Sequence, residues 1–232
     1  MYNNSQDFDV ILKCGDRQIH AHRVILRMWS PFFNRAFTSQ FSVAQSPVFV
    51  IDPDDDSDYE PLCAILKHVY GIPLKHYREN GVCDHKNSQH YLDYGIKIFT
   101  IADRLDFPSV RRAIVDIIRK RFELFSIRHT SRFGAVLSAI PDLAEQIARV
   151  CGPHAPLLAD KRLREFLLDW AVRVYSFMEK HPTFSVKLGD GSLFDAESTA
   201  EVRSRRDGIE RRFSKMRAAG RKRQAETETG IP

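Results

Sequence analysis

The first forty residues constrain the fold most, because apolar runs, a turn signal and helical spacings follow one another within a very short stretch. Residues 8–14 are mostly apolar, which predicts a strand largely buried on both faces. A Gly-Asp turn signal at 15–16 allows residues 17–21 to return antiparallel to that strand. Two short helical patterns follow within 24–37, divided by a Ser-Pro pair at 30–31 that suits a helix N-cap and first position. This segment can bury apolar side chains, but it contains no arrangement of groups suited to catalysis.

The rest of the chain is predicted to be mainly helical. Residues 48–51 are rich in β-branched side chains and predict one more strand, and the acids that follow favour the start of a helix. Residues 75–90 form a polar insertion, which we expect to be an exposed loop. Apolar residues at helical spacing predict further helices over 59–70, 91–105, 107–122, 133–150 and 163–178.

The spacing of apolar residues also predicts which side chains form the core. We expect these residues to point inward from the predicted strands and helices. The predicted core comprises Val10, Leu12, Val24, Leu26, Phe33, Phe37, Leu62, Leu66, Ile98 and Ile117.

The net charge of +5 is concentrated at the C-terminal end of the chain. Residues 201–232 hold ten Lys or Arg and five acids, so the first 200 residues are formally neutral. Low aromatic content and high charge are typical of disorder, and we therefore predict a charged, disordered tail over 183–232. The basic balance is weak evidence for a folded nucleic-acid-binding domain.

The sequence lacks the features typical of a disulfide-rich, membrane-spanning, secreted or catalytic protein. Four scattered cysteines do not form a disulfide framework in a chain of this size, which fits a reducing, intracellular location. No apolar run reaches the roughly 18–20 residues of a membrane span, and the N-terminus lacks a secretion signal. Phosphate-binding glycine loops and the Gly-x-Ser-x-Gly elbow are absent from the sequence, so we expect no enzyme, no catalytic residue and no cofactor.

Metal binding is the remaining chemical alternative. His20 and His22 share a strand face but have no third ligand at a suitable spacing. The acidic run 52–58 lacks the central Gly and terminal Glu of a calcium loop. A polar loop with Cys83, His85, His90 and His76 matches no strong zinc pattern, so a zinc-dependent protein is kept only as a rival hypothesis.

In three separated stretches, 8–12, 19–26 and 30–37, the sequence resembles the BTB/POZ domain, and in detail the BTB proteins abundant in filamentous fungi. The resemblance covers roughly residues 7–125. It implies an α+β BTB/POZ fold, in which a helical cluster is flanked by a small β-sheet, followed by an α-helical extension. We therefore expect a BTB domain over 1–125, a helical extension over 126–182 and the charged tail over 183–232.

The resemblance implies a protein–protein interaction module that homodimerises or heterodimerises. We expect dimer contacts from residues 1–12 and the helix 23–29. The resemblance also makes a cullin scaffold of ubiquitin ligases a candidate partner. Members that bind cullins commonly carry an apolar-x-Glu motif, where this sequence has Phe41-Ser42-Val43, so the usual acid is missing. The candidate interface residues are Phe8, Val10, Val24, Met28, Phe41, Val43, Tyr70 and Tyr91.

The basic tail supports an alternative function. Arg221, Lys222 and Arg223 form a candidate nuclear import signal, which leaves the nucleus, the cytoplasm or both as the expected location. The alternative is a transcription-linked nuclear regulator whose tail contacts nucleic acid. It is less favoured, because no zinc-finger or basic-zipper pattern accompanies the tail.

Overall fold

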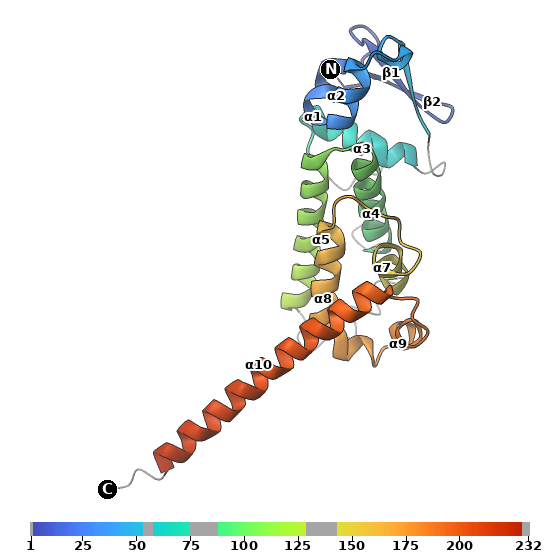
Figure 1. Cartoon of the computed structure of the whole chain (residues 1–232). Coiled ribbons are helices and arrows are strands. Elements are labelled where there is room, and N and C mark those ends of the chain that lie inside the picture. Colours follow the sequence, from blue (N-terminus) through green and yellow to red (C-terminus); the bar gives the residue numbers. More distant parts are fainter. Residues whose placement is uncertain (1, 53–57, 75–87, 129–142, 229–232) are drawn as a thin grey trace. The chain divides into compact units, whose positions relative to one another are not determined.

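The structure is a computed structural model, and it describes residues 2–52, 58–74, 88–128 and 143–228 (Figure 1). The chain divides into two compact units. The first unit comprises residues 1–146 and 156–163, and the second comprises residues 147–155 and 164–232.

A three-stranded sheet lies in the first unit, with the strand order β2-β1-β3. Strands β1 (Val10–Cys14) and β2 (Arg17–Ala21) are antiparallel, and Gly15 in their connecting turn has a φ of +58°, a conformation that glycine adopts without strain. Strand β3 (Val48–Ile51) runs parallel to β1. The hairpin and the third strand confirm the sequence prediction.

Burial alternates along β1, so the prediction that this strand is buried on both faces is wrong. Val10, Leu12 and Cys14 are buried, whereas Ile11 and Lys13 between them are half-exposed. A continuous apolar run cannot by itself distinguish a central strand covered on both sides from one that packs on the core through one face.

An aromatic cluster forms the centre of the core on the inner side of the sheet. The ring of Phe33 lies 5.5 Å from that of Phe37, 5.2 Å from that of Phe49 and 5.9 Å from that of Phe107, measured between centroids. These separations are typical of packed aromatic pairs. The cluster joins a helix, a strand and an interhelical turn that are far apart in the sequence.

The helical elements of this unit are α1 (Arg23–Trp29), α2 (Pro31–Thr38), the 3-10 turn η1 (Ser42–Ala44), α3 (Tyr59–Val69), α4 (Ser88–Arg104) and α5 (Pro108–Arg128).

Ser30 is the predicted N-cap of α2, and the structure confirms that role. Its hydroxyl oxygen accepts a hydrogen bond from the Phe33 backbone N–H at 3.1 Å, and Pro31 is the first helical residue. The same hydroxyl donates to the carbonyl oxygen of Leu105 at 2.6 Å. This buried side chain therefore starts α2 and also ties it to the end of α4, which lies alongside α5 (Figure 1).

Helices continue over most of residues 183–228, where the sequence led us to expect a disordered tail. The elements after residue 142 are α7 (Leu143–Cys151), α8 (Arg162–Met178), α9 (Pro182–Gly189) and α10 (Ala196–Glu228). Phe184, Leu193, Phe194 and Val202 are buried. These widely spaced anchors are enough to order the segment around them, although its average composition is polar. The structure therefore differs from the expected disorder over most of 183–228.

Eight of the ten predicted core residues are buried, which confirms the prediction at those positions. It is wrong for Val24, which is 68% exposed, and Ile117 is only half-buried. Val24 lies two residues before the buried Leu26, about 200° away around the helix, so both cannot face the core.

Among the described helices, none has the length and apolar character needed to cross a membrane.

Candidate protein-interaction surface

Helix α1 has three exposed large apolar side chains, of which Val24 and Met28 are the most exposed. Val24 is 68% exposed and Met28 is 72% exposed, and their i, i+4 spacing places them on one face. Leu26 points inward and is fully buried. The helix thus uses one side to attach to the core and offers an apolar pair on the other, which is the arrangement expected of a contact surface.

Arg23 fixes both the start of α1 and the loop that follows α2. Its backbone N–H donates to a carboxylate oxygen of Asp9 at 2.7 Å. Its guanidinium donates to the carbonyl oxygens of Ala44 and Ser46, and it lies 4.5 Å from the centre of the Phe37 ring. Since one side chain holds both segments, α1 and the loop around η1 are positioned together.

His22, at the N-cap position of α1, is tied to the end of α3. The Tyr70 hydroxyl oxygen accepts a hydrogen bond from the His22 backbone N–H at 2.9 Å and lies 2.7 Å from His22 Nδ1. Burial raises the pKa of this hydroxyl, so Tyr70 stays neutral and can donate its proton to the ring nitrogen. The Tyr2 ring packs edge-on against Tyr70 at 5.8 Å, which holds the N-terminal segment at the end of α3.

Phe41 is the one aromatic residue of the loop 39–47 that follows α2, and its side chain is exposed. It is 76% exposed and directly precedes η1, in which Ala44 is buried. A large apolar side chain that remains in solvent on a loop fixed by Arg23 is suited to enter a partner's pocket.

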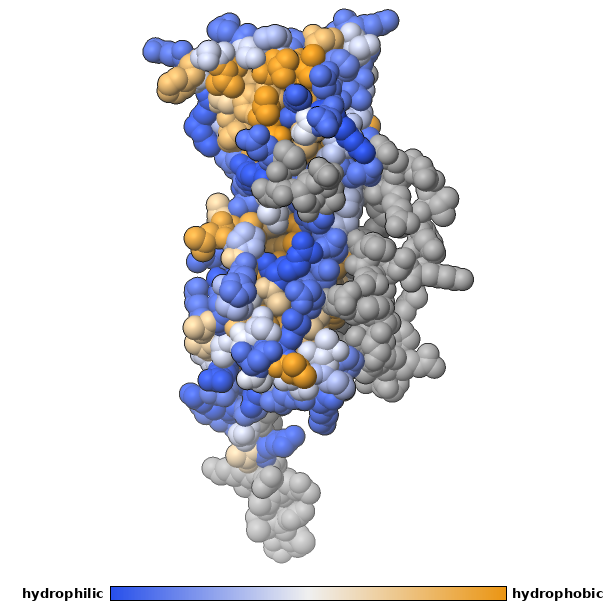
Figure 2. Space-filling view, turned by 90° about the vertical axis from the view of Figure 1, so that its right-hand side faces the viewer, coloured by the Kyte–Doolittle hydropathy of each residue, from blue (hydrophilic) through white to orange (hydrophobic). Residues whose placement is uncertain are grey.

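The outer face of the sheet is a further apolar area that the sequence analysis did not predict. Val50 is 59% exposed, and Ile11 and Val48 are half-exposed and directly opposite each other in the register. Figure 2 shows apolar side chains gathered on the surface of the first unit, in the region that carries the sheet. The sequence held no signal for this face, because the apolar runs of β1 and β3 do not show which side of each strand is covered.

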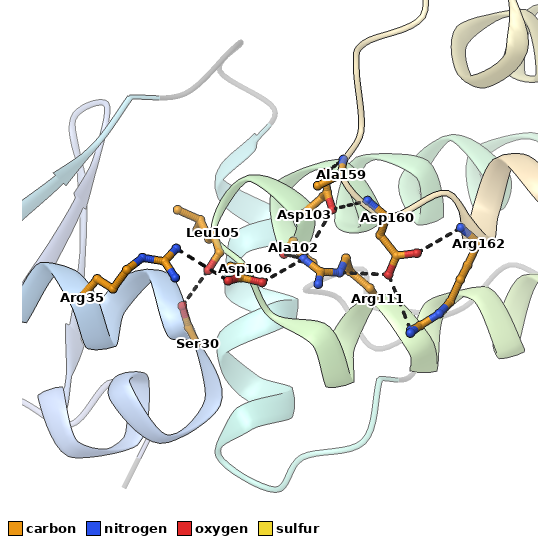
Figure 3. Close-up of polar contacts among 10 residues, drawn as sticks. All are labelled: Ser30, Arg35, Ala102, Asp103, Leu105, Asp106, Arg111, Ala159, Asp160 and Arg162. Carbon is orange, nitrogen blue, oxygen red and sulfur yellow. Dashed lines mark hydrogen bonds and ion pairs between the residues drawn. The ribbon is translucent and has the colours of Figure 1, made fainter.

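An ion cluster around Arg111 attaches a late segment of the first unit to the turn between α4 and α5 (Figure 3). Arg111 Nε donates to Asp160 at 3.1 Å, and Arg111 Nη1 lies 3.4 Å from Asp103 and 3.3 Å from Asp106. The Asp103 carboxylate also accepts hydrogen bonds from the backbone N–H groups of Ala159, at 2.7 Å, and Asp160, at 3.1 Å. Residues 159–160 are therefore held by α4 and α5 together.

This Arg111 cluster is largely withdrawn from solvent. The side chains of Arg111, Asp103 and Asp160 are 12%, 7% and 10% exposed. Buried charges are costly unless they are paired and hydrogen-bonded, and each of these carboxylates has several donors. Asp160 and Arg111 are 49 residues apart, so no local pattern in the sequence could reveal the pair.

The described cysteines are not suited to reactive chemistry. Burial raises the pKa of the Cys14 and Cys63 thiols, and it raises the pKa of Cys151 to about 12. Their thiolates, which are the nucleophilic and metal-binding forms, are disfavoured. Among the described residues, no three His, Cys, Asp or Glu side chains are grouped so as to hold a metal ion.

A family model of the BTB/POZ domain matches residues 1–121, which is more than half of the 232-residue chain. The chain belongs to the BTB/POZ domain family. This match confirms the family resemblance and the α+β fold that it implies, with a small sheet, a helical cluster and helices beyond the BTB domain. The domain is a protein–protein interaction module.

The chain is also similar to several Kelch-like proteins. Kelch-like protein 41 of Homo sapiens is 29% identical over 136 residues, which are 59% of this chain and 20% of that protein. Kelch-like protein 41b of Danio rerio is 26% identical over 62% of this chain and 21% of that protein. Kelch-like protein 40 of Xenopus laevis is 24% identical over 76% of this chain and 26% of that protein. The chain thus spans about a fifth to a quarter of the length of these relatives.

The predicted interface residues of the BTB domain have different positions in the structure. Val10 is fully buried, so its side chain belongs to the core and presents no surface to a partner. Phe8 is half-exposed, with its ring 4.4 Å from that of His20, and Val43 and Tyr70 are half-buried. Val24, Met28 and Phe41 are the well-exposed members of the set.

Some predicted residues lie outside what the structure describes. The side chains of Tyr91 and of the candidate import residues Arg221, Lys222 and Arg223 are not among the described ones, although the backbone at these positions is helical. The zinc hypothesis depends on Cys83, His85, His90 and His76, whose side chains also lie outside the described residues, and it stays untested.

Proposed function

We propose that this BTB domain associates with a second copy of itself through α1 and the N-terminal segment. The observation that carries the proposal is the apolar pair Val24 and Met28, which is exposed on a helix that is firmly anchored at its start by Asp9 and His22. In a two-fold dimer the same patch faces itself, so each exposed side chain is used twice. Burial of a Val or Met side chain contributes roughly 1.5–3 kcal/mol before the entropic cost of association.

Copurification of two differently tagged copies of the full chain tests this proposal. We expect the wild-type copies to be captured together, and we expect Met28→Asp in both copies to abolish capture, because two carboxylates would face each other at the interface. Thr183→Asp is the matched control, since it places the same charge on the exposed first turn of α9, where the helix dipole favours an acid. Equal capture of all three pairs would refute a dimer built on α1.

We also propose that the exposed Phe41 is the contact through which the domain binds a cullin scaffold. The support is the 76% exposure of its ring and the fixation of its loop by Arg23. Val43 stands where the resemblance leads us to expect an acid, so the contact relies on apolar burial rather than on a charge-assisted hydrogen bond.

Affinity capture of cullins from a cell extract separates adaptor use from self-association. We expect a cullin with the wild-type chain and with the neighbouring control Gln40→Ala, and its loss with Phe41→Ala. A cullin retained by Phe41→Ala would contradict Phe41 as the contact. A cullin absent from the wild type would contradict the adaptor role and leave the domain as a self-associating scaffold.

A further inference from the structure

The outer part of α10 carries cations that have no acidic partner among the described residues. Arg211, Arg212, Lys215 and Arg217 are exposed, and none of them forms a described ion pair or hydrogen bond. The sequence contains no Asp or Glu between residues 211 and 223. This part of the helix therefore has an excess of positive charge that the residues described by the structure do not neutralise.

The inner part of the same helix is different, because two of its cations, Arg205 and Arg206, have described acidic partners. Arg205 pairs with Glu201 and Asp169, at 3.5 Å from the latter. Arg206 lies 3.5 Å from Glu179 and 4.7 Å from the centre of the Tyr175 ring. The change from paired to unpaired cations occurs along one continuous helix, so we read the outer part as a surface for an external acidic group.

An apolar line runs along α10 from the packed part into the exposed part. Val202, Ile209 and Met216 are each seven residues apart and so lie on one face. Their exposure rises from 1% to 38% to 70% along the helix. The face that packs within the second unit at Val202 thus continues beyond that packing, with Arg212 and Arg217 on its two borders.

We propose that the outer part of α10, residues 207–219, docks into a partner protein's groove that is apolar at its floor and acidic at its rims. The line through Ile209 and Met216 fits the floor, and the unpaired cations fit the rims. Recognition of an amphipathic helix through anchors at such spacings is a common mode of peptide binding, and a basic amphipathic helix is typical of ligands for acidic grooves.

A nucleic acid or a lipid surface fits these observations less well. Phosphate binding uses the cations alone and gives no role to an apolar line that continues from the core of the second unit. A helix that lies in a membrane interface has a broad apolar face, whereas Arg212 and Arg217 are exposed on both borders of this line.

The experiment measures binding of the full chain to calcium-loaded calmodulin, used as a probe with an acidic-rimmed apolar groove, and in parallel to a 20-base-pair DNA duplex and to vesicles that contain phosphatidylserine. We expect the probe to bind, and we expect Met216→Ser to weaken that binding about tenfold, as the loss of one buried Met predicts. Met216→Leu should restore it. Replacement of Arg212 and Lys215 by Gln should also weaken probe binding.

The variants make each outcome decisive. Met216 is well exposed, so its substitution leaves the fold intact, and an unchanged far-ultraviolet circular dichroism spectrum verifies this. No binding to the probe, or equal binding by Met216→Ser, would overturn the proposal. Duplex binding that depends on the cations but not on Met216 would assign the helix to nucleic acid instead, and Met216-dependent vesicle binding without probe binding would assign it to membranes.

Discussion

Each unit contains one cluster of carboxylates around an arginine, and the two clusters differ in how far they are buried. Burial decides how strongly such ion pairs affect stability. Arg111 in the first unit pairs with the carboxylates of Asp103 and Asp160. The side chains of these two residues are 7% and 10% exposed. Arg164 in the second unit contacts Asp195 at 3.0 Å and Glu197 at 3.3 Å, but these carboxylates are 30% and 72% exposed. Solvent screens the second cluster more strongly than the first, in which only Asp106, at 31% exposed, is comparably accessible.

The two clusters also perform different structural tasks. The Arg111 cluster holds residues 159–160 against the turn between α4 and α5, over a large separation in sequence. In the Arg164 cluster, the Asp195 carboxylate accepts a hydrogen bond from the Ser198 N–H at 2.6 Å and so caps α10, while Arg164 Nη2 donates to the Ser198 hydroxyl at 2.8 Å. The first cluster fixes a tertiary contact, and the second orients the start of a helix.

The largest effect should follow from removal of the guanidinium in the first unit. We expect Arg111→Met to lower the free energy of unfolding by about 3–5 kcal/mol, because Asp103 and Asp160 lose their buried cation. Urea unfolding monitored by circular dichroism measures this loss. The triple variant with Asp103→Asn and Asp160→Asn should recover part of it. A loss below about 1 kcal/mol would show that solvent already screens this cluster.

A smaller effect is expected from the corresponding change in the second unit. We expect Arg164→Met to cost about 1–2 kcal/mol, since it removes charge-assisted hydrogen bonds from partly exposed acceptors. The control Glu197→Gln, at the most exposed acid of this cluster, should change the unfolding midpoint little. If Arg164→Met proved as damaging as Arg111→Met, exposure would not be the deciding difference between the clusters.

The buried thiol beside the second cluster provides a pH-dependent test. Burial raises the pKa of Cys151 to about 12, so folding favours its protonated form. Its contribution to stability is present below the ordinary thiol pKa of 9.0 and is lost as the pH rises from there toward 12. We expect unfolding midpoints at pH 8 and pH 10 to differ more in the wild type than in Cys151→Ala. Equal differences would mean that this thiol is not withdrawn from water.

Local chemistry in the sequence predicted the first third of the chain well. The turn at Gly15, the N-cap at Ser30 and the inward position of Leu26 and Phe33 all depend on near neighbours, and the structure confirms them. The apolar character of Val24 predicts a core position, and only the tertiary packing of α1 shows that its side chain faces solvent.

Contacts between distant residues could not be predicted in the same way. The Arg111–Asp160 pair depends on a chain reversal that no local spacing encodes. The helices over 182–189 and 196–228 depend on a few buried anchors such as Phe184 and Phe194 in a polar background, which an average composition conceals. The outer face of the sheet was missed because the apolar run of β1 does not show which of its sides is covered.

The central claim is that the BTB domain docks through an exposed apolar face of α1, and the molar mass of the full chain in solution tests it most directly. Light scattering coupled to size-exclusion chromatography, over a hundredfold range of loading concentration, should give twice the chain mass of 26.8 kDa for the wild type and for Thr183→Asp. Met28→Asp should give the mass of one chain. A wild type that stays at 26.8 kDa at every concentration, or a Met28→Asp variant that stays dimeric, would contradict the claim.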